Sequence, residues 1–277
     1  MSNDAISHLL SAPRYELLPF MGFEDELTKL PDGAKVAITA SPEKGLELTV
    51  DQSVRTAERG FETIPHIAAR AVESEAHLEE VATRLSDAGI EDLFVPGGDN
   101  EEPLGPYDSS YQLLTDLDER GYSFPEVGIT GYPEGHPIID DDTLIDELQK
   151  KEPYATYIVT QLCFDPTDII RWIEDIRGLG IELPVYVGIP GVMQYQRMLS
   201  ISRKVGVGDS IRFVKKTTGI LGMLRQMLGA KGRYEPDALI EGLSPYAGQA
   251  RYDIAGVHLY TFNQVDDIEH WRRDLLS

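Results

Sequence analysis

The chain has 277 residues, of which 47 are acidic and 25 are basic, so its formal net charge is −22 at pH 7. Such a surface repels nucleic acid and anionic membranes, which excludes both as predicted partners. An acidic surface is also typical of proteins from a high-salt cytoplasm, where ions screen the self-repulsion. The charge therefore favours a halophilic protein over an ordinary acidic one.

The single cysteine, Cys163, excludes an internal disulfide and fits a reducing cytoplasm. Because Cys163 lies at the end of an apolar run, we expect a small buried side chain without a catalytic role. The first thirteen residues lack the basic start and apolar run of a signal peptide, and no apolar stretch approaches the ~20 residues that span a bilayer. We therefore expect a cytoplasmic protein with no membrane partner.

Eight short strand-like runs alternate with helical patterns along the chain. The expected strands are Arg14–Leu18, Lys35–Thr39, Thr63–Ile67, Asp92–Pro96, Glu126–Thr130, Thr156–Gln161, Pro184–Gly188 and Asp253–Leu259. The expected helices are Asp51–Arg59, Ser74–Asp87, Ser109–Arg120, Thr143–Lys151, Asp165–Leu179, Met193–Lys204, Pro236–Leu243 and Asp266–Leu275. Asp165-Pro166 and Glu235-Pro236 are favourable helix starts, with proline at the first helical position.

Strands that alternate with helices predict a parallel sheet, and eight such units fit a (β/α)8 TIM barrel. An open doubly wound sheet is the alternative, but no Gly-x-Gly-x-x-Gly follows a strand, so its usual dinucleotide fingerprint is missing. Residues 189–252 separate the last two strands and predict extra helices there, with Gly206–Phe213 as a loop. We expect a single barrel domain over residues 1–277.

Polar side chains gather where the expected strands end, which is where a barrel builds an active site. Tyr132, Glu134 and His136 follow one strand, and Gln161 ends the next, with Asp165 close behind. Further strand-end residues are Glu16, Thr39, His66, Gly98, Asp99, Gly188 to Gly191, and Tyr260 to Asn263. Glu16 stands out because a carboxylate inside an apolar strand is costly to bury unless it is paired or used.

Two other chemistries were weighed against these residues. His66, Asp99, Glu134 and His136 could converge on a metal, but no His-x-His pair or His-Glu-x-x-His helix is present, so we predict no metal. A serine hydrolase is disfavoured because the chain contains no Gly-x-Ser-x-Gly elbow.

In order along nearly the whole chain, these segments resemble the methylenetetrahydrofolate reductase family. Tyr132-Pro-Glu-x-His136-Pro is the most specific of the matching motifs. The others are Tyr15-Glu-Leu-Leu-Pro19, Thr39, Pro65-His66, Gly98-Asp99, Tyr107, Lys150, Thr160-Gln161 with Phe164-Asp165, and Leu259-Tyr-Thr-x-Asn263.

The resemblance implies a reductase of one-carbon metabolism and methionine biosynthesis, which converts 5,10-methylenetetrahydrofolate to 5-methyltetrahydrofolate. It implies FAD as the cofactor and NADH or NADPH as the cosubstrate. By resemblance, Glu16 is the general acid, Asp99 favours a cationic intermediate of the folate, and Gln161 holds the pterin. The implied FAD-binding residues are Thr39, His66, Gly98, Asp99, Tyr107, Tyr132, His136 and Lys150.

Three departures from the family weaken the flavin contacts more than the folate contacts. Gly97 stands where the family commonly has an arginine, several polar residues expected within Asp142–Gln149 are not evident, and Pro19 stands alone where two prolines are frequent. We therefore expect weakly held FAD. Two alternatives stay open, namely a flavin-free folate reductase and a non-catalytic or methyl-transferring folate-binding protein. A homo-oligomer is compatible with the sequence. Because no long C-terminal extension is evident, we do not expect regulation by an appended domain.

Overall fold

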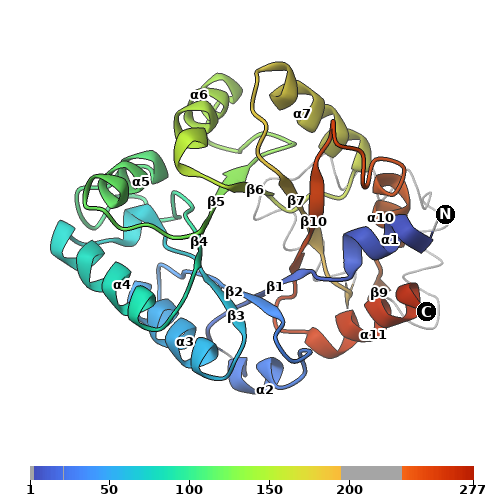
Figure 1. Cartoon of the computed structure of the whole chain (residues 1–277), viewed down its shortest axis with the longest axis horizontal. Coiled ribbons are helices and arrows are strands. Elements are labelled where there is room, and N and C mark those ends of the chain that lie inside the picture. The colour runs from blue at the N-terminus through green and yellow to red at the C-terminus, as the bar shows by residue number, and fades with distance from the viewer. Residues whose placement is uncertain (1–2, 21, 195–232) are drawn as a thin grey trace. The chain divides into compact units, whose positions relative to one another are not determined.

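The computed structural model describes residues 3–20, 22–194 and 233–277. Within them, eight parallel strands form one sheet in the order β3-β2-β1-β10-β7-β6-β5-β4 (Figure 1). A parallel bridge between His66 and Phe94 connects the β3 end of this order with the β4 end. The fold is therefore the predicted (β/α)8 TIM barrel. The strands are β1 (Arg14–Leu17), β2 (Lys35–Ile38), β3 (Glu62–Pro65), β4 (Asp92–Phe94), β5 (Glu126–Gly131), β6 (Tyr157–Thr160), β7 (Val185–Pro190) and β10 (Ile254–Tyr260).

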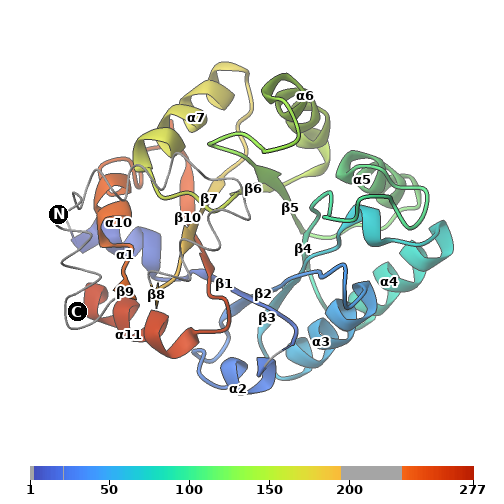
Figure 2. The same ribbon diagram turned by 180° about the vertical axis from the view of Figure 1, so that it is seen from behind.

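Helices follow most of these strands (Figure 1 and Figure 2). The α-helices are α1 (Asn3–Leu10), α2 (Phe23–Leu27), α3 (Leu46–Glu58), α4 (Glu75–Asp87), α5 (Ser110–Glu119), α6 (Asp141–Lys151), α7 (Pro166–Gly178), α10 (Asp237–Leu243) and α11 (Val265–Leu276). Two 3-10 turns, η1 (Ala69–Ala71) and η2 (Glu152–Tyr154), and a short antiparallel pair, β8 (Met193–Gln194) with β9 (Arg233–Tyr234), complete the described elements. None of the described helices has the length and apolar character needed to cross a membrane.

All eight predicted strands are confirmed, with ends that differ from the prediction by no more than two residues. The predicted helix Met193–Lys204 is wrong at its start, because Met193 and Gln194 pair with Tyr234 and Arg233 as strands. The rest of that helix and the expected loop Gly206–Phe213 lie outside the described residues. Asp165 caps α7 and Pro166 is its first residue, as predicted, whereas Pro236 caps α10 from outside the helix.

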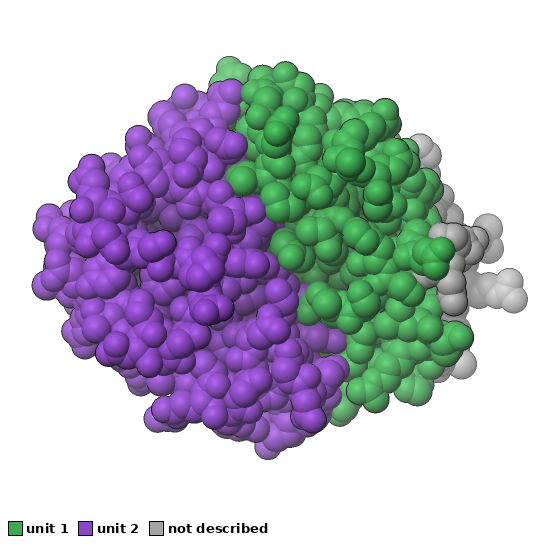
Figure 3. All heavy atoms as spheres, viewed as in Figure 1, with its two compact units in different colours: residues 1–13, 131–145, 159–277 green, residues 14–130, 146–158 purple. Residues whose placement is uncertain are grey.

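The chain divides into two compact units (Figure 3). Unit 1 comprises residues 1–13, 131–145 and 159–277, and unit 2 comprises residues 14–130 and 146–158. The expectation of a single domain stays a prediction.

In unit 2, strands β1, β2 and β3 pair in parallel, and β4 pairs with β5. Helices α3, α4 and α5 lie outside these strands (Figure 1). The apolar face of α4 is formed by Leu78, Val81, Ala82 and Leu85, which are buried at the spacing of helical turns. The Ser74 hydroxyl starts this helix by accepting a hydrogen bond from the His77 backbone N–H at 3.1 Å.

In unit 1, β7 pairs with β10 over six positions, and Val187 lies beside Val257. The Asp165 carboxylate caps α7 by accepting from the Thr167 backbone N–H at 2.8 Å. Helix α1 packs against β10, and a ring nitrogen of His8 lies 2.7 Å from the Ile254 carbonyl oxygen. The His8 contact lies at the Ile254 end of β10, and the pairing with β7 extends to the opposite end at Tyr260.

Candidate functional site

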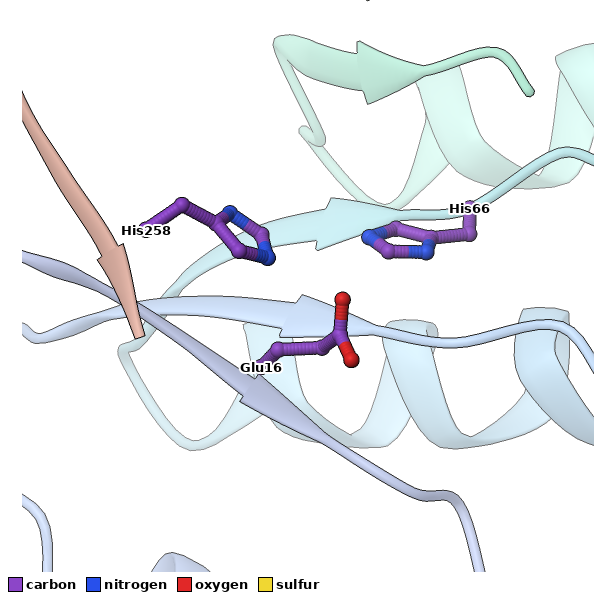
Figure 4. A group of neighbouring side chains, drawn as sticks. All are labelled: Glu16, His66 and His258. Atoms are coloured by element: carbon purple, nitrogen blue, oxygen red, sulfur yellow. The ribbon is translucent and has the colours of Figure 1, made fainter. Parts of the chain in front are cut away.

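Glu16 on β1 and His66 just after β3 lie in unit 2, and their side chains point toward one another (Figure 4). A carboxylate oxygen of Glu16 lies within 4.8 Å of a ring nitrogen of His66. Burial raises the pKa of the Glu16 carboxyl to about 7, although the charge of His66 acts to lower it. A carboxyl group with its pKa near neutrality is able to act as a general acid. Glu16 itself is half-buried, and its predicted role as a general acid stays a prediction.

Figure 4 also draws His258 of β10, which belongs to unit 1. Carboxylates and imidazoles, the groups that these residues carry, are chemically competent metal ligands. His258 is buried, and its ring lies edge-on to the Tyr260 ring at 5.1 Å. The expectation that the protein binds no metal stays a prediction.

Thr39 follows β2, and both its backbone N–H and its carbonyl group form hydrogen bonds within unit 2. Its N–H donates to the Leu17 carbonyl at 3.1 Å, and its carbonyl accepts from the Thr49 hydroxyl at 2.9 Å. The Thr39 hydroxyl oxygen is buried and has no hydrogen-bond partner among the described residues. Because a buried hydroxyl without a partner costs free energy, this atom favours a ligand that completes it.

Gly98 and Asp99 lie in a loop after β4 that Arg70 holds in place. The Arg70 guanidinium donates to the carbonyl oxygens of Asn100 at 2.8 Å and Glu101 at 2.6 Å. Gly98 has a φ of 97°, and a Cβ atom there would lie 3.1 Å from the Ala68 Cβ, so glycine is required for this close approach. The Asp99 side chain is exposed. The sequence analysis missed Arg70, because its partners lie 30 or more positions away.

Tyr107 is buried and uses its hydroxyl group within its own unit. The hydroxyl donates to the Asp116 carboxylate of α5, and burial together with this carboxylate raises the pKa of the Tyr107 phenol. Arg120 in turn binds Asp116 at 2.7 Å. Tyr107 thus has a structural partner in addition to the cofactor-binding role that the sequence predicts for it.

Lys150 lies on the exposed side of α6, one turn from two acidic residues. Its ammonium group lies 2.5 Å from Asp146 and 3.4 Å from Glu147. Ion pairs of this kind on an exposed helix are weak, so a phosphate is able to replace them. The neighbouring Lys151 is buried, and burial lowers the pKa of its amine to about 8.

The segment Tyr132 to Pro137, which we call the 132–137 turn, follows β5 in unit 1. The Gly135 N–H donates to the Tyr132 carbonyl at 3.1 Å, and Gly135 has a φ of 72°. The His136 ring lies edge-on to Tyr132 at 5.3 Å. Its Nδ1 accepts from the backbone N–H groups of Ile138 and Ile139, both at 3.3 Å. A neutral His136 therefore carries its proton on Nε2.

Gln161 and Tyr260 belong to the same unit. The Gln161 N–H donates to the Gly131 carbonyl at 2.7 Å, and the Gln161 side-chain oxygen accepts from the Leu162 N–H at 2.8 Å. The Tyr260 hydroxyl donates to the Thr160 carbonyl at 3.1 Å. This reach requires Gly188, because a Cβ atom there would lie 2.7 Å from the Tyr260 ring and 2.1 Å from the Thr160 carbonyl.

The structure thus brings predicted site residues together within each unit. Glu16 meets His66 in unit 2, and Tyr132 meets His136 in unit 1. A further contact joins Glu134 to Cys163, whose thiol donates to the glutamate at 3.0 Å. Cys163 is buried as predicted, but no pattern in the sequence indicated this partner.

The chain is similar in sequence to a known protein family and to several of its members. The sequence model of a family described as methylenetetrahydrofolate reductase matches residues 27–270. "Methylenetetrahydrofolate reductase 1" of Schizosaccharomyces pombe is 38% identical over 80 residues, which cover 28% of this chain and 13% of that protein. "5,10-methylenetetrahydrofolate reductase" of Pectobacterium carotovorum is 24% identical over 215 residues, or 75% of this chain and 67% of that protein.

The chain spans only a small part of several of these relatives. The match to "Methylenetetrahydrofolate reductase 2" of Saccharomyces cerevisiae is 24% identical and covers 50% of this chain but 25% of that protein. Among solved structures, a class V chitinase mutant from Cycas revoluta superposes with a TM-score of 0.52 at 9% identity, covering 96% of this chain and all of that chain. At this identity the likeness concerns the fold alone.

Proposed function

The chain belongs to the methylenetetrahydrofolate reductase family, and from this premise we propose that it reduces 5,10-methylenetetrahydrofolate to 5-methyltetrahydrofolate with NADH or NADPH. The observation that carries the proposal is the carboxyl group of Glu16, whose pKa burial raises to about 7. A proton held on this group near neutral pH is what the opening of the folate's five-membered ring demands. We place the protein in a reducing cytoplasm.

Glu16 acts as the general acid in this proposal. Protonated Glu16 donates its proton to the departing N10 of the substrate, which leaves an electrophilic iminium carbon on N5. The exposed carboxylate of Asp99 favours that cation electrostatically. The side-chain amide of Gln161 presents a donor and an acceptor to the pterin.

The described residues fit FAD as the cofactor. The Thr39 hydroxyl is buried without a partner among the described residues, Gly98 presents backbone without a side chain in its loop, and a neutral His136 carries a donor at Nε2. Lys150 offers a cation for the phosphates at the cost of two weak surface ion pairs. We assign Thr39, His66, Gly98, Asp99, Tyr107, Tyr132, His136 and Lys150 to FAD binding. When bound, FAD supplies hydride transfer between the nicotinamide and the folate.

Glu16→Gln tests the proposal because it removes the proton but keeps the side-chain shape. We expect folate reduction to fall by about 10²–10⁴-fold, the usual contribution of a general acid, while NAD(P)H-driven reduction of FAD continues. The matched control is Glu58→Gln, which makes the same change on the exposed end of α3 and leaves both reactions intact. Equal loss of both half-reactions in Glu16→Gln would show that Glu16 is structural.

The same preparations decide between the proposal and its flavin-free alternative. Apoprotein is titrated with FAD while flavin fluorescence is followed, and NAD(P)H-dependent folate reduction is measured with and without added FAD. We expect activity to rise with FAD occupancy. Full folate reduction with no FAD binding at tens of micromolar would support direct hydride transfer from the nicotinamide. Folate binding without any reduction would support a non-catalytic role.

A further inference from the structure

The buried thiol of Cys163 lies against the carboxylate of Glu134, which is part of the 132–137 turn. The sulfur is 3.0 Å from the Glu134 Oε1 and 3.6 Å from the Asp165 carbonyl oxygen. Cys163 is only 1% exposed, so solvent does not compete for this contact. The shorter distance identifies the glutamate as the main acceptor of the S–H group.

This contact differs from the others that shape the 132–137 turn. The Gly135–Tyr132 hydrogen bond and the two bonds to the His136 ring all lie within residues 132–139. These three bonds fix the conformation of the turn. The thiol–carboxylate contact connects the turn to the segment after β6, which also contains Gln161. A neighbouring backbone bond, from the Gln161 N–H to the Gly131 carbonyl, joins only the base of the turn to β6.

From this geometry we infer that Cys163 is a positioning residue, which acts through Glu134 to hold Tyr132 and His136 in place for their ligand. The inference rests on the proposed function, because it takes FAD as that ligand. Cys163 itself does not touch the reacting atoms in this scheme. Its own backbone N–H reaches the Gly188 carbonyl at 3.4 Å, so the residue is anchored independently of its thiol.

Cys163→Ala and Cys163→Ser separate this role from simple packing. Alanine removes the S–H donor, so the Glu134 carboxylate loses this hydrogen bond. Serine keeps a hydroxyl donor in nearly the same volume. We expect hydrogen–deuterium exchange in residues 131–140 to become about tenfold faster or more in Cys163→Ala, and to stay within about twofold of wild type in Cys163→Ser. Residues 75–87 of α4 provide the reference segment, which is expected to be unchanged in both variants.

The FAD dissociation constant, measured by flavin fluorescence, follows in the same proteins. We expect the dissociation constant to rise about tenfold in Cys163→Ala and in Glu134→Gln, and to stay near the wild-type value in Cys163→Ser. Unchanged exchange of residues 131–140 in Cys163→Ala would overturn the positioning role. If this segment exchanges faster but the wild type binds no FAD, the positioning of the turn stands and the flavin part of the proposed function fails. Equal damage in the serine and alanine variants would show that the thiol only fills space.

Discussion

Arg14 and Glu16 are two residues apart on β1, and both side chains are ionisable, yet their surroundings in unit 2 are opposite. Arg14 is fully buried and its guanidinium meets Asp92 at 2.8 Å and Glu126 at 3.0 Å. The Tyr157 ring covers it at 3.9 Å, and the Tyr157 hydroxyl donates to Asp92 at 2.7 Å. Glu16, by contrast, has a pKa raised by burial, with His66 only partly offsetting that shift.

In the proposed function, this one strand serves both stability and chemistry. At the amino end of β1, two carboxylates and a ring compensate the buried Arg14, so that its charge is retained. Gly128 makes this possible, because a Cβ atom there would lie 2.3 Å from the Tyr157 ring. Near the carboxyl end, burial raises the pKa of Glu16, and the charge of His66 offsets only part of that rise. We therefore expect Arg14 to dominate the stability and Glu16 the chemistry.

The largest expected effect on stability comes from removing the Arg14 charge. Arg14→Met leaves the largely buried Asp92 carboxylate with the Tyr157 hydroxyl but without its cationic partner, and we expect the free energy of unfolding to fall by about 3–5 kcal/mol. Arg59→Met is the control, because the exposed pair of Arg59 with Glu24 at 2.6 Å contributes about 0–1 kcal/mol. Urea unfolding of both variants measures the difference. Similar losses in the two proteins would contradict the distinction between the buried and the exposed arginine.

Glu16→Gln has the opposite effect on stability, and its size depends on pH. The pKa of Glu16 is about 7 in the folded protein, above its ordinary value, so the folded state binds this proton more tightly than the unfolded state. The contribution of Glu16 to stability is therefore greatest below its ordinary pKa and declines as pH rises through about 7. Relative to wild type, we expect the free energy of unfolding of the neutral variant to be about 3 kcal/mol higher at pH 8 and nearly the same near pH 4.5.

Urea unfolding across this pH range measures the effect, provided that each protein is compared with wild type at the same pH. Glu58→Gln, on the surface, is expected to show no such trend. A pH-independent difference between Glu16→Gln and wild type would mean that the Glu16 carboxyl does not titrate near neutrality in the folded protein.

Local patterns were sufficient to predict the strands and to place Glu16 on the first of them, because a strand is indicated by a short apolar run and by the turn residues next to it. The partners of Arg14 were not predictable in this way, since Asp92 and Glu126 lie 78 and 112 positions away. Helix α1 was missed because its short apolar face, Ile6, Leu9 and Leu10, is stabilised by distant contacts such as that of His8 with Ile254. The wrong helix start at Met193 has the same cause, because its strand partner is Tyr234.

Gly97 provides a way to sharpen the ligand-binding side of the comparison. The family resemblance places an arginine here, and nothing lies within 4 Å of a Cβ atom at this position, so a larger side chain is accommodated. We expect Gly97→Arg to bind FAD about ten- to hundredfold more tightly, since a charge-assisted hydrogen bond contributes about 1.5–3 kcal/mol. Gly97→Met, which adds length without charge, is the control. Fluorescence titration in which both variants match wild type would remove Gly97 as the cause of weak FAD binding.

Removing the Thr39 hydroxyl is expected to have a smaller effect on FAD affinity. Thr39→Val keeps the side-chain shape and removes the buried hydroxyl that lacks a partner among the described residues, so we expect FAD binding to weaken by about five- to tenfold without loss of stability. Thr56→Val is the matched control, because the Thr56 hydroxyl oxygen, on α3, is also buried and has no partner in the described part of the chain. Equal FAD affinities of the two variants would argue against a flavin contact at Thr39.

We expect salt to raise the stability of the protein by screening its surface charges, but to change the stability difference between wild type and Arg14→Met very little. With a formal charge of −22, the folded protein repels itself at low ionic strength, and we expect the melting temperature to rise between low and molar KCl. Because Arg14 is buried and the Asp92 side chain is only 14% exposed, screening reaches this ion pair far less than it reaches surface charges. The stability deficit of Arg14→Met should therefore change by less than about 0.5 kcal/mol, comparable with the usual error of adding independent effects. Paired melts of the two proteins in a KCl series measure both quantities. A flat or falling melting temperature would remove the halophile interpretation, and a deficit that disappears in salt would place the Arg14 pairs at the surface.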